Sequence, residues 1–313
     1  MLGRTANDLY WMARYVERAE NMARLLEVGQ RLSMLTHDGG ASEWRSTLRS
    51  AGCEAGYMAK NTAFDAERVM DYLIFDRDNP SSICACFDVA RRNARAQRTA
   101  ITREMWESLN TAWIELADRA KPGIKANELP ALFDWVRERS ALFRGAMLNT
   151  ILRNDRFFFI QLGTFVERAD NTARILDVKY YVLLPQNELV GGGIDSAQWA
   201  TILRSVSAHR SFRWVYRDAF KPWHIAEFLM LRPEMPRSLH SCYIEIEHAL
   251  AGLGQRYGSN PKSLEMARRI LGTLQFGQMS AIFQEGLHEF LSKFIAENNQ
   301  LARDIATTYH FDG

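Results

Sequence analysis

A carboxylate, an amide and a guanidinium recur together at two places in this sequence. Glu17, Asn21 and Arg24 follow one another at spacings of four and three residues, so on an α-helix all three lie on one face and can touch. The same residue types return at the same spacing 150 positions later, as Glu167, Asn171 and Arg174. Such a set can satisfy itself across a buried helix interface, or it can line a polar cleft that binds a zwitterionic or amide-bearing ligand.

These residues belong to a longer internal repeat. Residues 16–28 and 166–178 are identical at nine of thirteen positions. Further matches occur at offsets of 155 and 156 residues, between 44–50 and 199–205 and between 79–83 and 235–239. The offset grows slowly, as small insertions in loops would make it. We therefore expect two tandem halves, residues 1–149 and 150–313, each the size of a domain.

An arginine directly follows each repeated glutamate. Arg18 and Arg168 lie at the border of the apolar helix face. An arginine at such a border usually packs its stem on apolar surface and pairs its guanidinium with a carboxylate of another helix. If the two copies meet across a pseudo-two-fold axis, both Glu-Arg pairs come together.

Three interpretations of the repeated polar face are open: a solvated helix face, a structural ion-pair network, and a ligand or catalytic cleft. A solvated face would tolerate Lys, Gln, Glu or Ser interchangeably, whereas the two copies keep these identities while surrounding segments diverge. The network and the cleft both predict side chains that are less than half exposed, because exposed ion pairs contribute at most ~1 kcal/mol.

The segment 90–98 is the least symmetric part of the repeat. Arg91, Arg95 and Arg98 share one helical face and can bind a phosphate or a carboxylate. Ala251 stands opposite Arg95 in the second half. The alternative is a row of solvated arginines near the acidic Asp76, Asp78 and Asp88.

Apolar residues recur at helical spacing along nearly the whole chain, and the alternation that is typical of strands is almost absent. Breaks rich in glycine or proline delimit about five or six helices in each half, with tight turns at 79–81 and 235–237. We predict an all-α fold of two tandem, internally duplicated antiparallel helical bundles, in which Glu17 and Glu167 lie on equivalent helices.

The composition limits the partners and the location. The 313 residues are 47% hydrophobic and 24% charged, which is typical of a globular protein, and the net charge of +2 is too small to favour nucleic acid or an anionic membrane. No apolar run approaches the ~20 residues that span a bilayer. Residues 1–8 lead directly into a polar helical pattern without the apolar core of a signal peptide. We expect a cytoplasmic protein that binds neither membrane nor nucleic acid.

The sequence carries no self-contained catalytic signature. The seven histidines lack HxxxH and HExxH spacing, and no glycine-rich phosphate loop is present. The four cysteines form no CxxC pair, so we expect them to act as small buried hydrophobic residues. We predict no metal and no bound cofactor.

Residues 1–21 strongly resemble the start of the bacterial alpha-E family, which is named for a helical domain with a Glu-Arg motif. The likeness spans the whole chain and includes residues 79–83, 90–95 and 106–110. The motif corresponds to Glu17-Arg18 and again to Glu167-Arg168. The family's Asn-Ala-Arg stretch corresponds only to Asn93-Ala94-Arg95, in the first half.

The resemblance implies partner proteins as well as an all-helical fold. Such proteins are encoded beside, or fused to, a circularly permuted ATP-grasp protein. A transglutaminase-like protein and, in some cases, a proteasome-like peptidase occur in the same neighbourhoods. This context suggests formation or modification of amide bonds on peptides or amino acids.

Our leading hypothesis is that the chain is the helical component of such an ATP-grasp-linked system. The partner would make an acyl-phosphate, and this chain would bind the acceptor, the acyl intermediate or the partner through the repeated polar face. Glu17 and Glu167 are the candidate catalytic bases or amine-binding carboxylates. The candidates for binding substrate or partner are Arg18, Asn21, Arg24, Asn93, Arg95, Arg168, Asn171 and Arg174. The alternative is a non-catalytic scaffold, in which the Glu-Arg faces are structural ion-pair networks.

Overall fold

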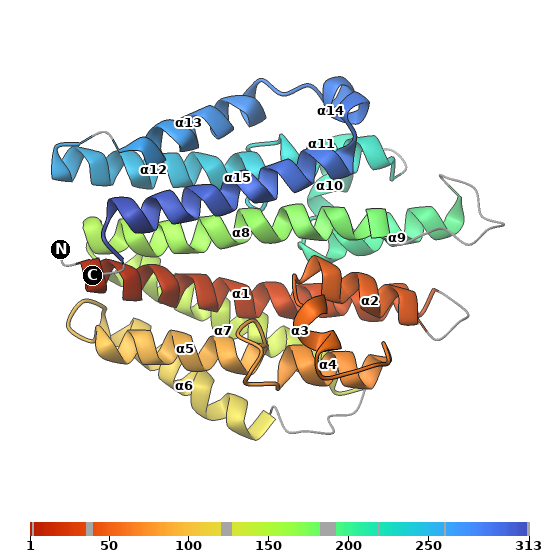
Figure 1. Cartoon of the computed structure of the whole chain (residues 1–313), viewed down its shortest axis with the longest axis horizontal. Helices are drawn as coiled ribbons and strands as arrows, with labels where there is room; N and C mark the ends of the chain where they lie inside the picture. The colour runs from red at the N-terminus through yellow and green to blue at the C-terminus, as the bar shows by residue number, and fades with distance from the viewer. Residues whose placement is uncertain are drawn as a thin grey trace.

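A computed structural model describes residues 1, 3–35, 40–119, 127–181, 192–217, 220–259 and 261–311, and every regular element within these ranges is a helix (Figure 1). This confirms the predicted all-α class. In chain order the helices are α1 (Gly3–Ser33), α2 (Ala41–Ser50), α3 (Glu54–Met58), α4 (Ala66–Ile74), α5 (Ile83–Ala96), α6 (Arg103–Arg119), α7 (Leu129–Thr150), α8 (Asp155–Tyr181), α9 (Gly193–Ser205), α10 (His209–Tyr216), α11 (Pro222–Met230), α12 (Leu239–Tyr257), α13 (Lys262–Gln275), α14 (Met279–Glu285) and α15 (Leu287–Thr308).

Two long helices, α1 and α8, lie side by side through the middle of the molecule (Figure 1). Helices α5 and α7 pack on α1, and α12 and α15 pack on α8. The short helices α2 and α9 each contact both central helices. Because α1 and α8 are covered on several sides, their polar residues as well as their apolar ones are removed from solvent.

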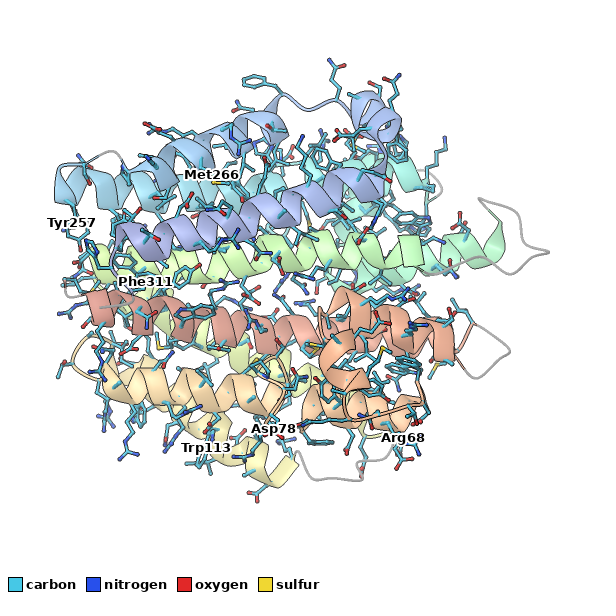
Figure 2. The ribbon with its side chains drawn as sticks, viewed as in Figure 1. Arg68, Asp78, Trp113, Tyr257, Met266 and Phe311 are labelled. Atoms are coloured by element: carbon cyan, nitrogen blue, oxygen red, sulfur yellow. The ribbon has the colours of Figure 1, made fainter. Side chains whose placement is uncertain are left out.

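The two halves share a hydrophobic core. One cluster of buried residues runs from Ala6 near the start of the chain to Phe311 near its end, and a second cluster lies within the first half. Phe311 lies near the end of the chain beside the central helices (Figure 2). The centre of its ring is 5.3 Å from that of Tyr10 on α1 and 6.0 Å from that of Phe159 on α8. The predicted boundary near residue 149 falls at the end of α7. The division into two separate bundles stays a prediction.

Corresponding side chains hold the outer helices against the central pair. Ser140 on α7 donates its hydroxyl to the Val16 carbonyl oxygen at 3.4 Å, and Asn298 on α15 donates its amide to the Val166 carbonyl oxygen at 3.1 Å. Val16 and Val166 are partners in the sequence repeat. The contact of α7 with α1 therefore has a counterpart in the contact of α15 with α8.

The two predicted proline turns lead into α5 and α12 in the same way. Ser82 caps α5 by accepting a hydrogen bond from the Ala85 N–H at 3.1 Å, and Ser238 caps α12 by accepting one from the Ser241 N–H at 3.0 Å. The residues just before these caps, Ser81 and Arg237, thus occupy matching places in the fold.

None of the described helices is long and apolar enough to cross a membrane.

The close approach of α1 and α8 depends on Gly163. A Cβ atom at this position would lie 2.1 Å from the carbonyl oxygen of Tyr10 and 3.1 Å from the Cβ of Ala13. A backbone atom cannot move aside as a flexible side chain can, so any residue larger than glycine forces the two central helices apart.

We therefore expect Gly163→Ala to lower the free energy of unfolding by about 3 kcal/mol, the upper end of typical overpacking penalties. Urea denaturation followed by circular dichroism measures the change. Gly145→Ala is the matched control, because an added Cβ at that α7 position meets nothing within 4 Å. The control should be neutral or stabilised by about 0.4–1 kcal/mol. Equal losses in both variants would contradict the proposed close approach.

Candidate functional site

The central helices exchange their Glu-Arg pairs. Arg18 donates Nε to Oε1 of Glu167 at 2.6 Å and Nη2 to Oε2 at 3.0 Å. Arg168 donates Nε to Oε1 of Glu17 at 2.9 Å and Nη2 to Oε2 at 3.0 Å. Each arginine thus holds the glutamate of the other half in a bidentate pair, which is a strong and directional form of ion pair. The predicted meeting of the two Glu-Arg pairs is confirmed.

A second set of contacts links each central helix to a short helix. Arg174 donates Nη1 to the carbonyl oxygen of Ser50, the last residue of α2, at 3.3 Å. Arg24 donates Nη1 to the carbonyl oxygen of Ser205, the last residue of α9. Carbonyl groups at a helix C-terminus have no partner within the helix, so they accept such donors readily.

An acidic residue on the same helix binds each of these two arginines. Arg24 donates Nη2 to Glu20 Oε1 at 2.8 Å, and Arg174 donates Nε to Asp170 Oδ2 at 2.6 Å. Glu20 and Asp170 are partners in the repeat and lie four residues before their arginines, the spacing that brings two side chains together on a helix.

The predicted burial of the repeated polar face is also confirmed. The exposed fractions are 1% for Glu17, 3% for Asn21, 5% for Glu167 and 8% for Asn171.

Two further arginines close the polar network around Glu17. Arg237 donates Nη1 to Glu17 Oε1 at 3.1 Å and to Asn21 Oδ1 at 3.3 Å, and its Nη2 pairs with Glu20. Arg144 donates Nη1 to Glu17 Oε2 at 3.1 Å and also pairs with Glu20. We call the set Glu17, Glu20, Asn21, Arg24, Arg144, Arg168 and Arg237 the Glu17 cluster.

The arginines keep the Glu17 carboxylate charged. Burial by itself would raise the pKa of Glu17, but the charges of Arg168, Arg237 and Arg144 outweigh it and hold that pKa far below the ordinary value of 4.5. Glu17 is therefore a weak proton acceptor near neutral pH, where an effective general base has a pKa close to the working pH.

Glu167 is held in a similar way by a different pair of arginines. Arg14 donates Nε to Glu167 Oε2 at 2.7 Å, opposite the bidentate contact from Arg18. Burial opposes ionisation here as well, yet the charges of Arg18 and Arg14 lower the pKa of Glu167 to about 2. The ion pairs therefore favour a binding role for Glu167, and the catalytic role of both glutamates stays a prediction.

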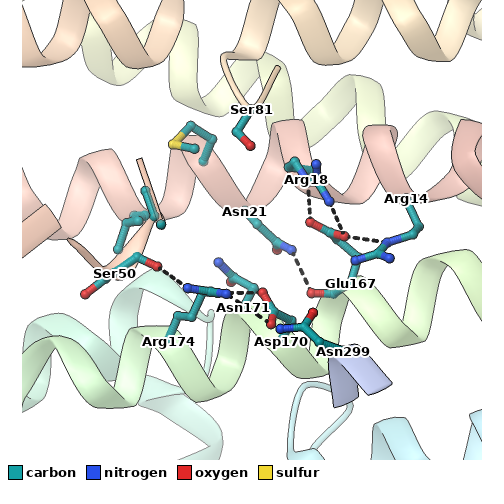
Figure 3. Close-up of a pocket in the computed structure, with 14 residues that line it drawn as sticks. Arg14, Arg18, Asn21, Ser50, Ser81, Glu167, Asp170, Asn171, Arg174 and Asn299 are labelled. Carbon is teal, nitrogen blue, oxygen red and sulfur yellow. Dashed lines mark hydrogen bonds and ion pairs between the residues drawn. The ribbon is translucent and has the colours of Figure 1, made fainter. Parts of the chain in front are cut away.

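A polar pocket opens beside Glu167. It has a volume of about 200 Å³ and lies between α1, α8, the end of α2 and the turn before α5 (Figure 3). Asn21, Ser50, Ser81, Asn171 and Asn299 supply uncharged polar groups to its lining. The charged lining residues are Arg14, Arg18, Glu167, Asp170 and Arg174. We call this space the Glu167 pocket.

Half of the predicted site residues meet in this pocket. Arg18, Asn21, Glu167, Asn171 and Arg174 line it. Glu17, Arg24 and Arg168 belong to the Glu17 cluster instead.

Asn93 and Arg95 lie elsewhere, on α5. Arg95 is exposed, and neither residue lines the Glu167 pocket, so the structure does not bring them together with the Glu-Arg pairs. Their neighbour Arg91 donates to Asn110 Oδ1 at 2.9 Å and lies 4.1 Å over the ring of Trp113 on α6 (Figure 2). The proposed basic face is thus partly used for packing α5 on α6.

Five residues of the network were not predicted from the sequence: Arg14, Glu20, Arg144, Asp170 and Arg237. Glu20 and Asp170 recur in the repeat, which was a usable signal for both. Arg14 and Arg237 correspond to Thr164 and Ser81, so a search for repeated residues could not find them. A weak sequence match aligns Arg144 with Arg303, but the contacts of Ser140 and Asn298 place Ala302 at the position that corresponds to Arg144.

The described residues contain no group of three or more His, Cys, Asp and Glu side chains placed to hold a metal ion. The cysteines are free. Burial raises the pKa of Cys84 to about 11 and that of Cys242 to about 12, which keeps both thiols protonated and unreactive near neutral pH.

Comparison with known proteins agrees with this architecture. Residues 1–310 match the Alpha-E family, described as a predicted alpha-helical domain with a conserved ER motif. The chain belongs to this family. Two of its Glu-Arg dipeptides, at 17–18 and 167–168, are the ones that exchange ion pairs across the central helices.

The chain is also similar to uncharacterised mycobacterial proteins. It is 35% identical to one from Mycobacterium bovis and 34% identical to one from Mycobacterium tuberculosis strain H37Rv, each over 331 aligned residues. Each alignment covers 97% of this chain but only 36% of the relative, so the chain spans little more than a third of the relatives' length. No solved structure matches it.

We expect Glu17→Gln to cost about 3–5 kcal/mol of stability, because the change leaves buried arginines without their shared carboxylate. Urea denaturation at neutral pH measures the loss. Glu107→Gln is the control, since the Arg103–Glu107 pair on α6 has side-chain exposures of 83% and 54% and such pairs contribute at most ~1 kcal/mol. A Glu17→Gln protein as stable as the control would show that the cluster does not hold the fold.

The lowered pKa of Glu167 predicts loss of stability in acid. A carboxyl group whose pKa falls from 4.5 to about 2 on folding stabilises the folded state fully above about pH 5. This contribution is lost as the pH drops from about 5 toward 2, because the Glu167 carboxylate then binds a proton in the unfolded chain but stays ionised in the folded chain. Urea midpoints measured between pH 7 and pH 3 should fall, and Glu167→Gln should flatten this dependence. An unchanged slope in that variant would contradict the assignment.

Proposed function

We propose that this chain is the acceptor-binding component of an ATP-grasp-linked system that forms or modifies peptide or amide bonds. The Glu167 pocket binds the amino-acid or peptide acceptor. The partner protein uses ATP to convert a carboxylate into an acyl-phosphate. The acceptor amine then attacks the carbonyl carbon, phosphate leaves, and the amine proton passes to solvent.

The observation that carries this proposal is the composition of the pocket. Carboxylates of Glu167 and Asp170 and guanidinium groups of Arg14, Arg18 and Arg174 line one small space. Groups of both signs can bind the ammonium and the carboxylate of one zwitterion. A volume of about 200 Å³ suits an amino-acid-sized group, since pockets for drug-sized ligands typically measure about 300–1,000 Å³.

Both ends of such an acceptor find matching groups. Arg18 uses Nε and Nη2 for Glu167, so within the described part of the chain its Nη1 is left for a ligand carboxylate. Asp170 and the amide of Asn171 lie in the same lining and can accept hydrogen bonds from a cationic group of the acceptor.

The ion pairs favour binding over proton transfer. Glu167 stays ionised because Arg18 and Arg14 lower its pKa to about 2. A carboxylate that is always charged attracts an amine strongly but takes its proton poorly. Activation of the carboxylate substrate is therefore left to the ATP-grasp partner.

The length of the relatives supports a fused or neighbouring partner. The mycobacterial proteins extend well beyond the region that matches this chain, as a fusion to another domain would require. Partnership with a transglutaminase-like protein or a proteasome-like peptidase is supported by the family resemblance alone.

A scaffold function is the second candidate, and the Glu17 cluster favours it. Every carboxylate of that cluster is bound by two or more arginines. If the Glu167 pocket serves the same purpose, the family's Glu-Arg motif locks helices together and binds no substrate.

Reconstitution with the ATP-grasp partner distinguishes these two functions. The chain is first tested for co-purification with the partner, and ATP-dependent ligation of amino-acid acceptors is then measured with and without the chain. We expect Asp170→Asn to reduce ligation by ~10-fold or more, the effect of losing a hydrogen bond to a charged group, with the protein still folded. A folded Asp170→Asn protein that supports full ligation would instead favour the scaffold.

Arg95→Ala serves as the matched arginine control. Because Arg95 is exposed on α5 and lies outside the Glu167 pocket, its removal should change neither the melting temperature nor the ligation rate. Loss of ligation in a stable Arg95→Ala protein would move the working site to the basic face of α5.

A further inference from the structure

The Glu17 cluster and the Glu167 pocket are built from matching residues, but only the first is filled by the chain itself. Glu17, Glu20 and Asn21 correspond in the repeat to Glu167, Asp170 and Asn171. In the Glu17 cluster one guanidinium group, that of Arg237, binds all three of these residues. In the Glu167 pocket no arginine of the turn before α5 takes the corresponding place, and a cavity is left there.

The turn before α5 explains why it is missing. Ser81 and Arg237 each precede the serine that caps the next helix, and matching backbone bonds join Ser82 N–H to the Asn79 carbonyl at 3.0 Å and Ser238 N–H to the Met235 carbonyl at 2.9 Å. Ser81 lines the Glu167 pocket (Figure 3). Its short side chain leaves the space that the Arg237 guanidinium occupies on the other side.

One buried acceptor in the pocket is left without a donor. The Oδ1 atom of Asn171 is shielded from solvent and has no hydrogen-bond partner among the described residues, and Asn171 is only 8% exposed. Its counterpart, Asn21 Oδ1, accepts from Arg237 Nη1. An unsatisfied buried acceptor of this kind costs about 1–3 kcal/mol, so it marks a place where a donor from outside the chain is expected.

The two sides also differ in their number of arginines. The Glu17 cluster holds two carboxylates and four arginines, Arg24, Arg144, Arg168 and Arg237. The Glu167 pocket holds two carboxylates and three arginines in its lining. Ala302 stands where the contacts of Ser140 and Asn298 place the counterpart of Arg144, so a second guanidinium is absent there too. Arg14 replaces only one of the two.

We propose that the Glu167 pocket binds a guanidinium group of its ligand, in the position that Arg237 takes in the Glu17 cluster. The guanidinium donates to Glu167, Asp170 and Asn171 Oδ1. A guanidinium suits this set better than an ammonium, because its planar fork can reach several fixed acceptors at once, whereas an ammonium is a compact and strongly hydrated charge.

The ligand class that follows is an arginine side chain, either of the free amino acid or of a peptide. Its identity as the acceptor of the ligation rests on the proposed function, but the guanidinium site itself does not. Binding can therefore be tested on this chain alone, without ATP or a partner protein.

The first experiment is isothermal titration calorimetry of the purified chain with L-arginine and L-citrulline, which differ in charge but hardly in shape. We expect arginine to bind and citrulline to bind ~10-fold or more weakly, because citrulline offers no charged donor. L-lysine tests whether an ammonium suffices, and N-acetyl-arginine methylamide tests whether the peptide form is preferred. Citrulline or lysine binding as tightly as arginine, or no binding of arginine at millimolar concentration, would overturn the proposal.

The second experiment places a guanidinium in the pocket by a substitution in the chain itself. Ser81→Arg should fill the pocket as Arg237 fills the cluster, raising the melting temperature by about 2 °C or more and abolishing arginine binding. Ser81→Met is the control of similar length without charge, and it should bring no such gain. If Ser81→Arg is no more stable than Ser81→Met, the acceptors of the pocket do not accept a guanidinium and the proposal fails.

The two proposals can fail separately. If the chain binds arginine but the reconstituted system ligates no acceptor, the guanidinium site stands and the ligation function falls. If the system ligates acceptors without preference for arginine, and arginine does not bind, the acceptor-binding function stands and the guanidinium inference falls.

Discussion

The structure depends on the exchange of two Glu-Arg pairs between α1 and α8. Arg18 holds Glu167 and Arg168 holds Glu17, each through two hydrogen bonds. Ion pairs of this kind are sensitive to position, because a shift of one residue along either helix breaks both. The close contact at Gly163 brings the helices near enough for the exchange. Helices α5 and α7 pack on α1 of this pair, and α12 and α15 pack on α8.

Joining two helices through buried ion pairs carries a large desolvation penalty. Taking charges out of water costs several kcal/mol per ion, and well-packed apolar residues often stabilise an interface as well or better. Around Glu17 the cost is offset by a dense set of donors from four arginines. Around Glu167 the offset is incomplete, since Asn171 Oδ1 has no partner in the part of the chain that the structure describes and a pocket remains. The incomplete side is where a ligand can complete the network, so the asymmetry itself points to the functional side.

Much of this arrangement could be predicted from the sequence, and the limits have physical causes. Helical periodicity predicts the fold class, and the repeat predicts that Glu17, Asn21, Glu167 and Asn171 are buried. A helical wheel shows which residues share a face but not which helix lies opposite, so it could not show that each arginine pairs with the glutamate of the other half. Arg144 and Arg237 lie on a distant helix and in a turn, and their counterparts are Ala302 and Ser81. A comparison of the two halves cannot reveal an arginine whose partner in the other half is a serine or an alanine, and such arginines make the two sides differ. Arg95 was chosen because it is asymmetric, yet it lies on the exposed face of another helix.

Two matching clusters at one interface allow two tasks to be separated. A site that must both hold the core together and release a ligand would lose stability each time the ligand left, because buried charges would be exposed without partners. Here the Glu17 cluster is closed by arginines of the chain itself. In the pocket Arg14 and Arg18 bind Glu167 and Arg174 binds Asp170, so both carboxylates keep partners when the pocket is empty. In the proposed guanidinium site, the ligand supplies the donor group that the turn at Ser81 does not.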